Sequence, residues 1–343
     1  MEQTATADRN QRIIYAMMLL LVIVGGLIIY KANAALGVIH KAQLTGTMQP
    51  RTNLVPVPGG DQINVVSRSI NYFGVIWPAL LFGILISAAV RVLNPPQWLS
   101  RSFGENRVRS QLIAGLAGAP LMLCSCCVAP VFSGVYERSS RLGPSLAVLL
   151  AAPSLNPAAL ILTFLLFDVK IGLVRVAMAL LIVFLTGMLI ERFVSVPPVD
   201  CSTSVSEDSE LLLKSFLRSC WQVAIRTLPL IAVGVLVSMA IALWFPFSSL
   251  ASTGGQLVVI IIVALIALPL ALPTFFEIPL ALILLAAGAP AGAAVALMIA
   301  GPAVNLPSLF TIARSTNWKV AAWLAFAVFI LAVAGGVLVG FVK

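Results

Sequence analysis

A stretch of the chain that occurs twice constrains its fold more than any other feature. Residues 120–156 return without a gap at 269–305. The residues that recur in register are Pro120 and Pro269, Pro130 and Pro279, Gly143 and Gly292, Pro153 and Pro302, and Asn156 and Asn305. Leucine and alanine match by chance in apolar sequence, but prolines and asparagines in register do so rarely. We therefore interpret the chain as an internal duplication.

The breaks within the repeated segments indicate where polar chemistry belongs. Apolar segments that are interrupted by proline and glycine at corresponding places in two copies are typical of secondary transporters, whose discontinuous helices meet near the bilayer midplane. Backbone groups freed by a break cannot face lipid, so they are buried in protein or line a cavity. We therefore look for a site at the breaks and not along the long apolar runs.

The composition excludes a soluble globular domain. Of the residues, 60% are hydrophobic and 10% are charged, and the mean hydropathy is +1.07. We therefore expect most of the protein surface to contact the lipid bilayer. The net charge of +9 comes from Lys and Arg in short segments between apolar runs, which is the ordinary bias of cytoplasmic loops. We therefore predict a multi-pass protein of the inner (cytoplasmic) membrane that binds no nucleic acid.

The distribution of apolar runs predicts an all-α polytopic membrane protein with an extra N-terminal span and two internal repeats of about four apolar segments each. The expected parts are an N-terminal anchor with an external loop (1–69), a first repeat (70–194), a linker (195–214) and a second repeat (215–343). We expect the first span over 13–30 and a polar loop over 32–69. A cleavable signal is the alternative, although typical signal cores are shorter, about 7–15 residues.

Two orientations of the repeats fit these runs. If every apolar run crosses the membrane, each copy has four spans and the repeats are parallel. If the runs 111–136 and 256–288 are re-entrant hairpins, each copy has three crossings and the repeats are inverted. The second arrangement, which we favour, places one set of basic residues on the cytoplasmic side: Arg101, Arg107, Arg109, Arg138, Arg141, Arg314 and Lys319.

The first break carries three cysteines in four residues. The run is Cys124, Ser125, Cys126 and Cys127, between Pro120 and Pro130, where continuous helix is not expected. Thiols are soft ligands that favour soft ions and thiophilic metalloids, and three of them in one turn can converge on one centre. We therefore predict substrate ligands here, which become metal ligands if the solute is a metal or metalloid. The alternatives are buried cysteines that act as small hydrophobes, and a redox pair with the C-x-x-C spacing of thiol–disulfide oxidoreductases.

Glu277 is the charged residue that the second break contributes. It lies in the motif 273–279, and no other charge occurs between 227 and 313. An ionisable group at the centre of a spanning helix costs roughly 2.5–3.5 kcal/mol, so it normally faces a polar cavity and marks a substrate or proton path. Its counterpart in the first copy is Val128, next to Cys127, so we expect the thiols and this carboxylate to meet at one central site. We predict that Glu277 couples transport to protons; a carboxylate near the membrane interface is the alternative.

Two asparagines followed by proline indicate restarts of broken helices. Asn is a strong N-cap and Pro suits the first helical turn, and half-helix N-termini offer free N–H groups to a polar solute or oxyanion. We therefore predict Asn156, Asn305 and Thr274 as substrate contacts, with Ser154 as a weaker candidate; capping alone is the alternative. The predicted helix breaks are Pro120, Pro130, Pro153, Pro157, Pro273, Pro279, Pro302 and Pro307. We expect Asp168, Lys170, Arg175 and Arg226 to be interfacial, at the ends of spans.

At these motifs the chain resembles predicted permeases of the ArsP/YraQ type. The matching pieces are Cys124-Ser125-Cys126 with Pro130, the basic turn 138–143, the Pro-Ser-Leu-Asn-Pro run at 153–157, and the two-copy layout from about 70 to 343. Some members of that family are similar to efflux permeases for trivalent organoarsenicals. The resemblance implies a cytoplasmic-membrane permease with Cys124 and Cys126 as substrate ligands. This chain has Cys127 where the family commonly has Gly.

Together these features predict a permease and not an enzyme. We expect it to export a small thiophilic solute, a trivalent metalloid such as an organoarsenical, through a cysteine-lined central site. The alternatives are a soft metal ion or small sulfur oxyanion as solute, a membrane-embedded thiol–disulfide oxidoreductase, and a non-transporting scaffold. The chain has no G-x-x-x-x-G-K-[ST] motif, so we expect no ATP hydrolysis. We expect no cofactor, since His40 has no second imidazole to bind metal with; a second copy of the chain or a small cytoplasmic thiol protein could be a partner.

Overall fold

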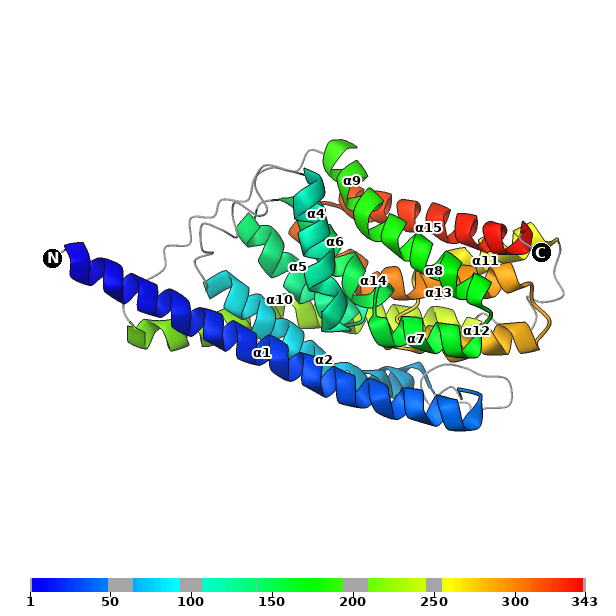
Figure 1. The fold of residues 1–343 in the computed structure, drawn as a ribbon, viewed down its shortest axis with the longest axis horizontal. Helices are drawn as coiled ribbons and strands as arrows, with labels where there is room; N and C mark the ends of the chain where they lie inside the picture. Colours follow the sequence, from blue (N-terminus) through cyan, green and yellow to red (C-terminus); the bar gives the residue numbers. More distant parts are fainter. Residues whose placement is uncertain are drawn as a thin grey trace.

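The fold is a bundle of packed helices, in which several helices run lengthwise and others are inclined to them (Figure 1). The computed structural model describes residues 2–48, 64–92, 107–139, 141–193, 209–244 and 255–341, and the regular elements in these ranges are all helical. Six helices in the described ranges are long and apolar enough to cross a membrane, and a bent helix pair makes up to seven. The prediction of an all-α polytopic membrane protein is therefore confirmed.

The helices divide into an N-terminal helix and two matching series. The N-terminal helix is α1 (Glu2–Thr45). The first series is α2 (Val65–Val92), α4 (Arg107–Gly118), the 3-10 turn η1 (Ala119–Leu121), α5 (Ser125–Ser139), α6 (Leu142–Ser154), α7 (Pro157–Leu166), α8 (Val169–Leu181), the π-helical turn η2 (Ile182–Thr186) and α9 (Gly187–Phe193). The second series is α10 (Ser209–Trp244), α11 (Gln256–Ala267), α12 (Glu277–Ala286), α13 (Ala291–Ala303), α14 (Leu306–Ser315) and α15 (Trp318–Phe341).

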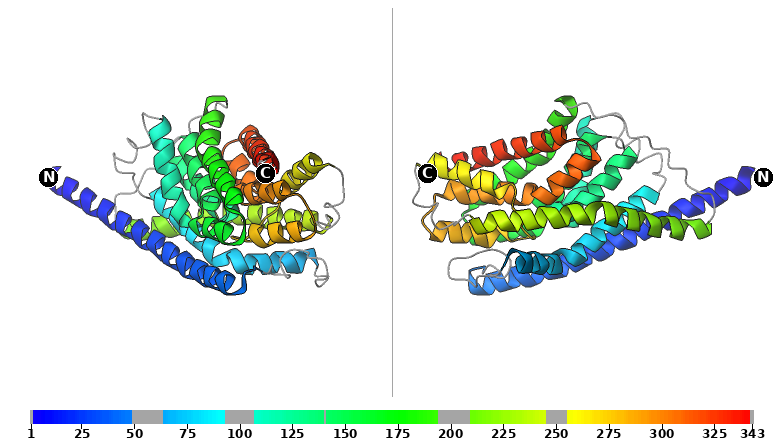
Figure 2. Two further views of the ribbon diagram at one scale, coloured as in Figure 1. Left: turned by 45° about the vertical axis from the view of Figure 1, so that its right-hand side comes forward. Right: turned by 180° about the vertical axis from the view of Figure 1, so that it is seen from behind.

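The two series are inverted copies of each other. Their first helices, α2 and α10, pack antiparallel, because Phe216 near the start of α10 clusters with Ala88 and Ala89 near the end of α2. Figures 1 and 2 show α10 on the face of the bundle opposite to α4. Two helix starts that correspond in the two copies therefore lie at opposite ends of the bundle. This arrangement is the inverted one that we favoured from the sequence.

Two glycine pairs make the equivalence of the copies visible at atomic level. A side chain on Gly187 would meet the carbonyl oxygen of Gly143 at 2.9 Å, and one on Gly336 would meet that of Gly292 at 2.6 Å. In the first copy the start of α6 thus crosses α9 backbone to backbone, and in the second copy the start of α13 crosses α15 in the same way. Close approach of this kind is what small residues provide in membrane helices.

Two pairs of short helices, α4 with α5 and α11 with α12, form hairpins. Along α4, position 111 lies beside Gly143 at the start of α6, and Gly118 lies beside Val148 further along α6. Helix α4 therefore runs parallel to α6, whereas α5 turns directly into α6 and runs the opposite way. In the second copy, Ile260 of α11 lies beside Gly292 at the start of α13, so α11 and α12 repeat the arrangement. With 12 and 10 residues, α11 and α12 are too short to cross a bilayer core about 30 Å thick.

The N-terminal helix extends further than the sequence predicted. Helix α1 continues to Thr45 and ends where Gly46 takes a left-handed conformation, with a φ of 64°, as is common at helix C-termini. The expected loop over 32–69 is therefore wrong for its first part. The reason is that 32–45 contains no proline and carries apolar residues such as Ala35 and Ala42, which are buried. Residues 49–63 lie outside the described ranges.

The boundaries of the repeats also shift slightly. Helix α2 begins at Val65, before the expected start of the first repeat at 70. Helix α10 begins at Ser209, so the last part of the predicted linker 195–214 is helical; its earlier part lies outside the described residues. The division into an N-terminal part, two repeats and a linker otherwise stays a prediction.

The charges distinguish the two ends of the bundle. We call the end that carries the starts of α6 and α15 and the end of α14 the inner end, because it holds Arg141, Arg314 and Lys319. The opposite end, where α1 and α7 finish, is the outer end. By the positive-inside bias we expect the inner end to face the cytoplasm. Arg101, from the same predicted basic set, lies outside the described residues.

Candidate functional site

The first hairpin is interrupted at the cysteines. The 3-10 turn η1 contains Pro120, and Met122 takes a left-handed conformation with a φ of 49°. Helix α5 then begins at Ser125, with the amides of Cys127 and Val128 donating to the carbonyl of Cys124 at 3.0 and 3.1 Å. Cys124 is thus the last residue of the interruption, and Cys126 and Cys127 lie on the first turn of α5.

The three cysteine sulfurs form a compact triangle. The Sγ of Cys124 lies 3.2 Å from that of Cys126 and 2.9 Å from that of Cys127, and the third side is 3.9 Å. All three residues are free and buried. Among the thiol, imidazole and carboxylate side chains of the described ranges, these three cysteines form a group close enough together to hold one metal ion. Three sulfurs in this arrangement suit a soft, three-coordinate centre.

Helix α2 supports the triangle from the side. The hydroxyl of Tyr72 lies 3.3 Å from the Sγ of Cys126, and Tyr72 is fully buried. Gly83 lets α2 approach the carbonyl of Cys127 so closely that a side chain at this position would collide with it. Neither residue was predicted, because both are far from the cysteine motif in sequence.

The second hairpin is interrupted at the matching place by a longer stretch without helix. It runs from the end of α11 to Phe276, includes Pro273, and contains Phe275 with a φ of 73°. Phe275 and Met122 are the non-glycine residues with clearly positive φ in the described ranges. Strained backbone of this kind collects at functional sites because the surrounding structure must hold it. Both hairpin interruptions thus contain one non-glycine residue with a positive φ.

One cavity of about 740 Å³ joins the two interruptions. From the first it receives Cys124, and from the second Thr274. Its wall is completed by α1, from Lys31 near the middle of the span Met17–Thr45 to Thr45 at the outer end. The lining residues are Tyr30, Lys31, Ala34, Gly37, Val38, Lys41, Ala42, Thr45, Thr47, Met48, Gly74, Val75, Ile76, Ala79, Cys124, Pro273, Thr274, Phe275, Phe276 and Pro279. The cavity therefore leads from the outer end of the bundle to the cysteines.

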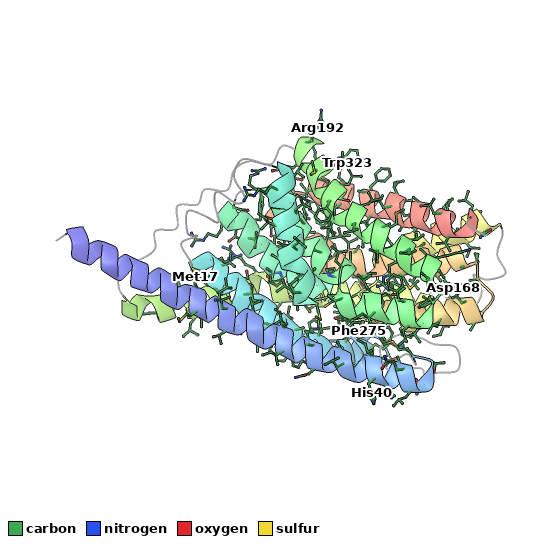
Figure 3. The ribbon with its side chains drawn as sticks, viewed as in Figure 1. Met17, His40, Asp168, Arg192, Phe275 and Trp323 are labelled. Carbon is green, nitrogen blue, oxygen red and sulfur yellow. The ribbon has the colours of Figure 1, made fainter. Side chains whose placement is uncertain are left out.

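Helix α1 forms one side of this cavity, and Figure 3 shows α1 along the outside of the bundle. Phe275 lies between α1 and the rest of the bundle, whereas His40 projects from the opposite face of α1. Ala42 of α1 packs against Leu162 of α7 and Ile278 of α12. The Nζ of Lys31 donates a hydrogen bond to the Oγ1 of Thr274 at 3.4 Å. Thus the N-terminal helix, which the sequence suggested only as an anchor, contacts the second interruption directly.

Glu277 is held by an arginine of the other copy. Its Oε1 lies 2.8 Å from the Nη2 of Arg175, and both side chains are almost completely buried, with exposed fractions of 4% and 2%. Arg175 also donates to the Oγ1 of Thr163 at 2.6 Å. Glu277 itself does not line the large cavity, although its neighbour Phe276 does. The structure therefore brings the thiols and the second interruption together, and turns the carboxylate towards Arg175.

The prediction that Arg175 is interfacial was wrong. Helix α8 begins at Val169, so Arg175 lies well inside it, and burial is possible because Glu277 neutralises the guanidinium. The sequence does contain a signal for this contact. Arg175 is a lone cation within an apolar run of the first copy, and Glu277 is a lone anion in the second.

Both predicted asparagines cap restarted helices. The Oδ1 of Asn156 accepts from the amides of Ala158 and Ala159, at 3.1 and 3.4 Å. The Oδ1 of Asn305 accepts from the amide of Ser308 at 3.0 Å in a capping box. Neither lines the large cavity. Their geometry matches the capping role, and their role as substrate contacts stays a prediction.

The predicted break prolines behave in three ways. Pro157 and Pro307 lie in the first turns of α7 and α14, where the missing N–H has no cost, and Pro153 and Pro302 lie in the last turns before those restarts. Pro120 and Pro273 lie in the hairpin interruptions. The prediction was wrong for Pro130 and Pro279, which lie inside α5 and α12. Each is within the first two turns of its helix, so little hydrogen bonding is lost.

Comparison with known proteins agrees with this architecture. A family described as predicted permeases, ArsP_1, matches residues 63–341. The UPF0718 protein YraQ of Escherichia coli (strain K12) is 30% identical over 273 residues, which are 78% of this chain and 78% of the relative. The UPF0718 protein MJ0584 of Methanocaldococcus jannaschii is 23% identical over 323 residues, covering 74% of this chain and 87% of the relative. No solved structure matches the chain.

Proposed function

The chain belongs to this family of predicted permeases, and from that membership we propose that it is a secondary transporter of a small thiophilic solute. The solute that suits the site best is a trivalent metalloid such as an organoarsenical, and the direction is export across the inner membrane. The observation that carries the proposal is the sulfur triangle of Cys124, Cys126 and Cys127 beside a cavity that leads to the outer end.

The spacing of the sulfurs supports a soft central atom. With bonds of about 2.3 Å from a thiolate to a soft centre, three coordinated sulfurs lie about 3.4–4.0 Å apart. The observed separations are 2.9, 3.2 and 3.9 Å, so a small opening of the triangle makes room for the atom. An inorganic trivalent arsenic centre carries three hydroxyl groups and can bind all three sulfurs, whereas a mono-organoarsenical carries two and binds two of them. Each sulfur–metalloid bond that forms displaces one hydroxide, which leaves as water with the proton of the thiol.

The second interruption offers a means of proton coupling. Phe276 lines the cavity, and the next residue is Glu277, whose carboxylate pairs with Arg175. Protonation of Glu277 removes the negative charge from the pair and leaves a buried guanidinium without its partner, which costs several kcal/mol. The stretch 273–276 must then rearrange. The charge state of Glu277 would thus be linked to the shape of the cavity wall.

The contacts at the inner end support an outward-open state. The hydroxyls of Ser133 on α5 and Ser315 on α14 lie 2.9 Å apart, which ties the first hairpin to the second copy. Arg141 also pairs with Glu191 at 3.0 Å. Alternating access between inverted repeats requires the Ser133–Ser315 contact, which joins the two copies, to part while the outer cavity closes.

Transport into everted membrane vesicles tests the proposal. Vesicles with the intact chain should accumulate methylarsonous or phenylarsonous acid, and a proton gradient should alter the rate. Cys124→Ser, Cys126→Ser and Glu277→Gln should each reduce the flux at least about tenfold, since each removes a ligand or the coupling charge. Cys220→Ser is the matched control, because Cys220 lies half-buried on α10 outside the cavity. If all the site variants transport like the control, the site is wrong.

One observation favours a second candidate, the thiol–disulfide oxidoreductase. The sulfurs of Cys124 and Cys127 are 2.9 Å apart in C-x-x-C spacing, close enough to form a disulfide after a small movement. Redox titration separates the two functions. A Cys124–Cys127 disulfide that cycles with a dithiol partner would support the enzyme, whereas thiols that remain reduced during solute flux support the permease. A soft metal ion and a sulfur oxyanion remain the alternative solutes for the permease.

A further inference from the structure

The cavity is positively charged because of a helix that lies outside the family match. The match begins at residue 63, and α1 ends at Thr45. Yet α1 places two lysines, Lys31 and Lys41, in the cavity wall. Among the lining residues in the described ranges none is acidic. This charge is therefore a feature that α1 adds to the part of the chain that the family match covers.

The position of Lys31 requires an explanation. It lies at the middle of the span Met17–Thr45, roughly 20 Å along the helix from the outer end at 1.5 Å per residue. That is too far for the side chain to reach the membrane surface by snorkelling, which explains lysines near helix ends. Charged groups at this depth normally face a water-filled path or a substrate. Lys31 does face the cavity, beside the hydrogen bond to Thr274.

No carboxylate in the described ranges pairs with Lys31. The ion pairs of this part of the chain join Arg91 with Glu137, Arg141 with Glu191, and Arg175 with Glu277. The contact of Lys31 is the neutral hydroxyl of Thr274. Within the described ranges, its positive charge is therefore available to a solute in the cavity. Cys124 lines the same cavity, so a thiophilic centre and a negative group of one solute can be bound together.

We infer that α1 makes this permease selective for solutes that carry a negative charge as well as a thiophilic centre. This inference rests on the proposed function, and it adds the charge of the solute to it. Two sources of the charge share this chemistry: an acidic substituent on a trivalent metalloid, and a soft oxyanion such as thiosulfate. Lys31 acts at the level of the cysteines, and Lys41 acts nearer the outer end, where it attracts the solute into the cavity.

A chemical probe measures the charge of the cavity without transport. In a chain that keeps Cys124 as its one cysteine, we compare two methanethiosulfonate reagents, one with a sulfonate and one with a trimethylammonium group. The sulfonate reagent should modify Cys124 faster. Lys31→Gln should lower the ratio of the two rates about tenfold, as expected for loss of one charge nearby in a low-dielectric site. Lys31→Arg should keep the ratio, and Lys319→Gln at the inner end, an exposed position, serves as the control for a general change in charge.

Transport of a matched solute pair then tests selectivity. Phenylarsonous acid and its 4-carboxy derivative share the thiophilic centre and differ by one negative charge. We expect the carboxylated compound to be transported faster, and Lys31→Gln to remove that preference. Thiosulfate, with sulfate as a hard anion of equal charge, tests the second source. Equal transport of both arsenicals by the intact chain, with an unchanged reagent ratio in Lys31→Gln, would overturn the inference. Transport of none of these solutes would instead refute the proposed function.

Discussion

Arg175 of the first copy and Glu277 of the second form an ion pair inside the bundle, with 2.8 Å between Nη2 and Oε1. Thr163 on α7 receives a further hydrogen bond from Arg175. The pair therefore joins α7 and α8 to the start of α12, next to the stretch that walls the cavity. It links the position of the second interruption to the charge of one carboxyl group.

Removing one partner of this pair should destabilise the protein strongly. Arg175→Met leaves an unpaired buried carboxylate, and loss of one partner from a buried pair costs about 3–5 kcal/mol. Glu277→Gln, which leaves the guanidinium unpaired, should also destabilise. The double variant Arg175→Met with Glu277→Met should recover much of the loss, because no buried charge remains. Thermal unfolding in detergent measures all three.

The matched control for the pair is Arg141→Gln. Arg141 pairs with Glu191 at the inner end, where the side chains are 23% and 17% exposed, so water can solvate the remaining charge. A smaller destabilisation is expected there. Equal effects at the two pairs would contradict the view that burial makes the Arg175–Glu277 contact important.

The sulfur triangle should bind one trivalent arsenical per chain. Cys124→Ser and Cys126→Ser should each weaken binding at least about tenfold, since an oxygen ligand is a poor substitute for sulfur on a soft centre. Tyr72→Phe should weaken it less, because it removes only the hydroxyl that contacts Cys126. Arsenic content per chain after gel filtration gives the stoichiometry, with Cys220→Ser as the unchanged reference. Full binding by Cys124→Ser would exclude the triangle as the site.

The crossing of α13 and α15 should not tolerate a methyl group. A side chain on Gly336 would meet the carbonyl oxygen of Gly292 at 2.6 Å, so Gly336→Ala should destabilise by about 1–3 kcal/mol, as overpacking does. Gly25 is also helical but has no neighbour within 4 Å of an added carbon. Gly25→Ala should therefore be neutral or slightly stabilising through helix propensity. Thermal unfolding of the two variants side by side decides whether the contact matters.

The sequence predicts the breaks well because their signals are local. Proline and asparagine in register mark the restarts at Asn156 and Asn305, and the cysteines lie where the interruption after η1 gives way to α5. The contact between Arg175 and Glu277 joins residues that are 102 positions apart, so no local pattern could place the two side chains together. The part of α1 in the cavity wall was missed for a different reason. Its polar residues resemble a loop, and only tertiary contact shows that they face a cavity.

The inner end should act as a gate that a disulfide can lock. The hydroxyl oxygens of Ser133 and Ser315 lie 2.9 Å apart, so cysteines at both positions bring their sulfurs close enough for a small movement to form a disulfide. In a chain with Ser133→Cys and Ser315→Cys, oxidation should join the first hairpin to α14 and stop solute flux, and a reductant should restore it. The single variant Ser133→Cys controls for oxidation of the native thiols, since the same oxidant should leave its flux largely intact. If the oxidised double variant is fully cross-linked and still transports, the inner end does not open during the cycle, and the alternating movement of the two copies must be sought elsewhere.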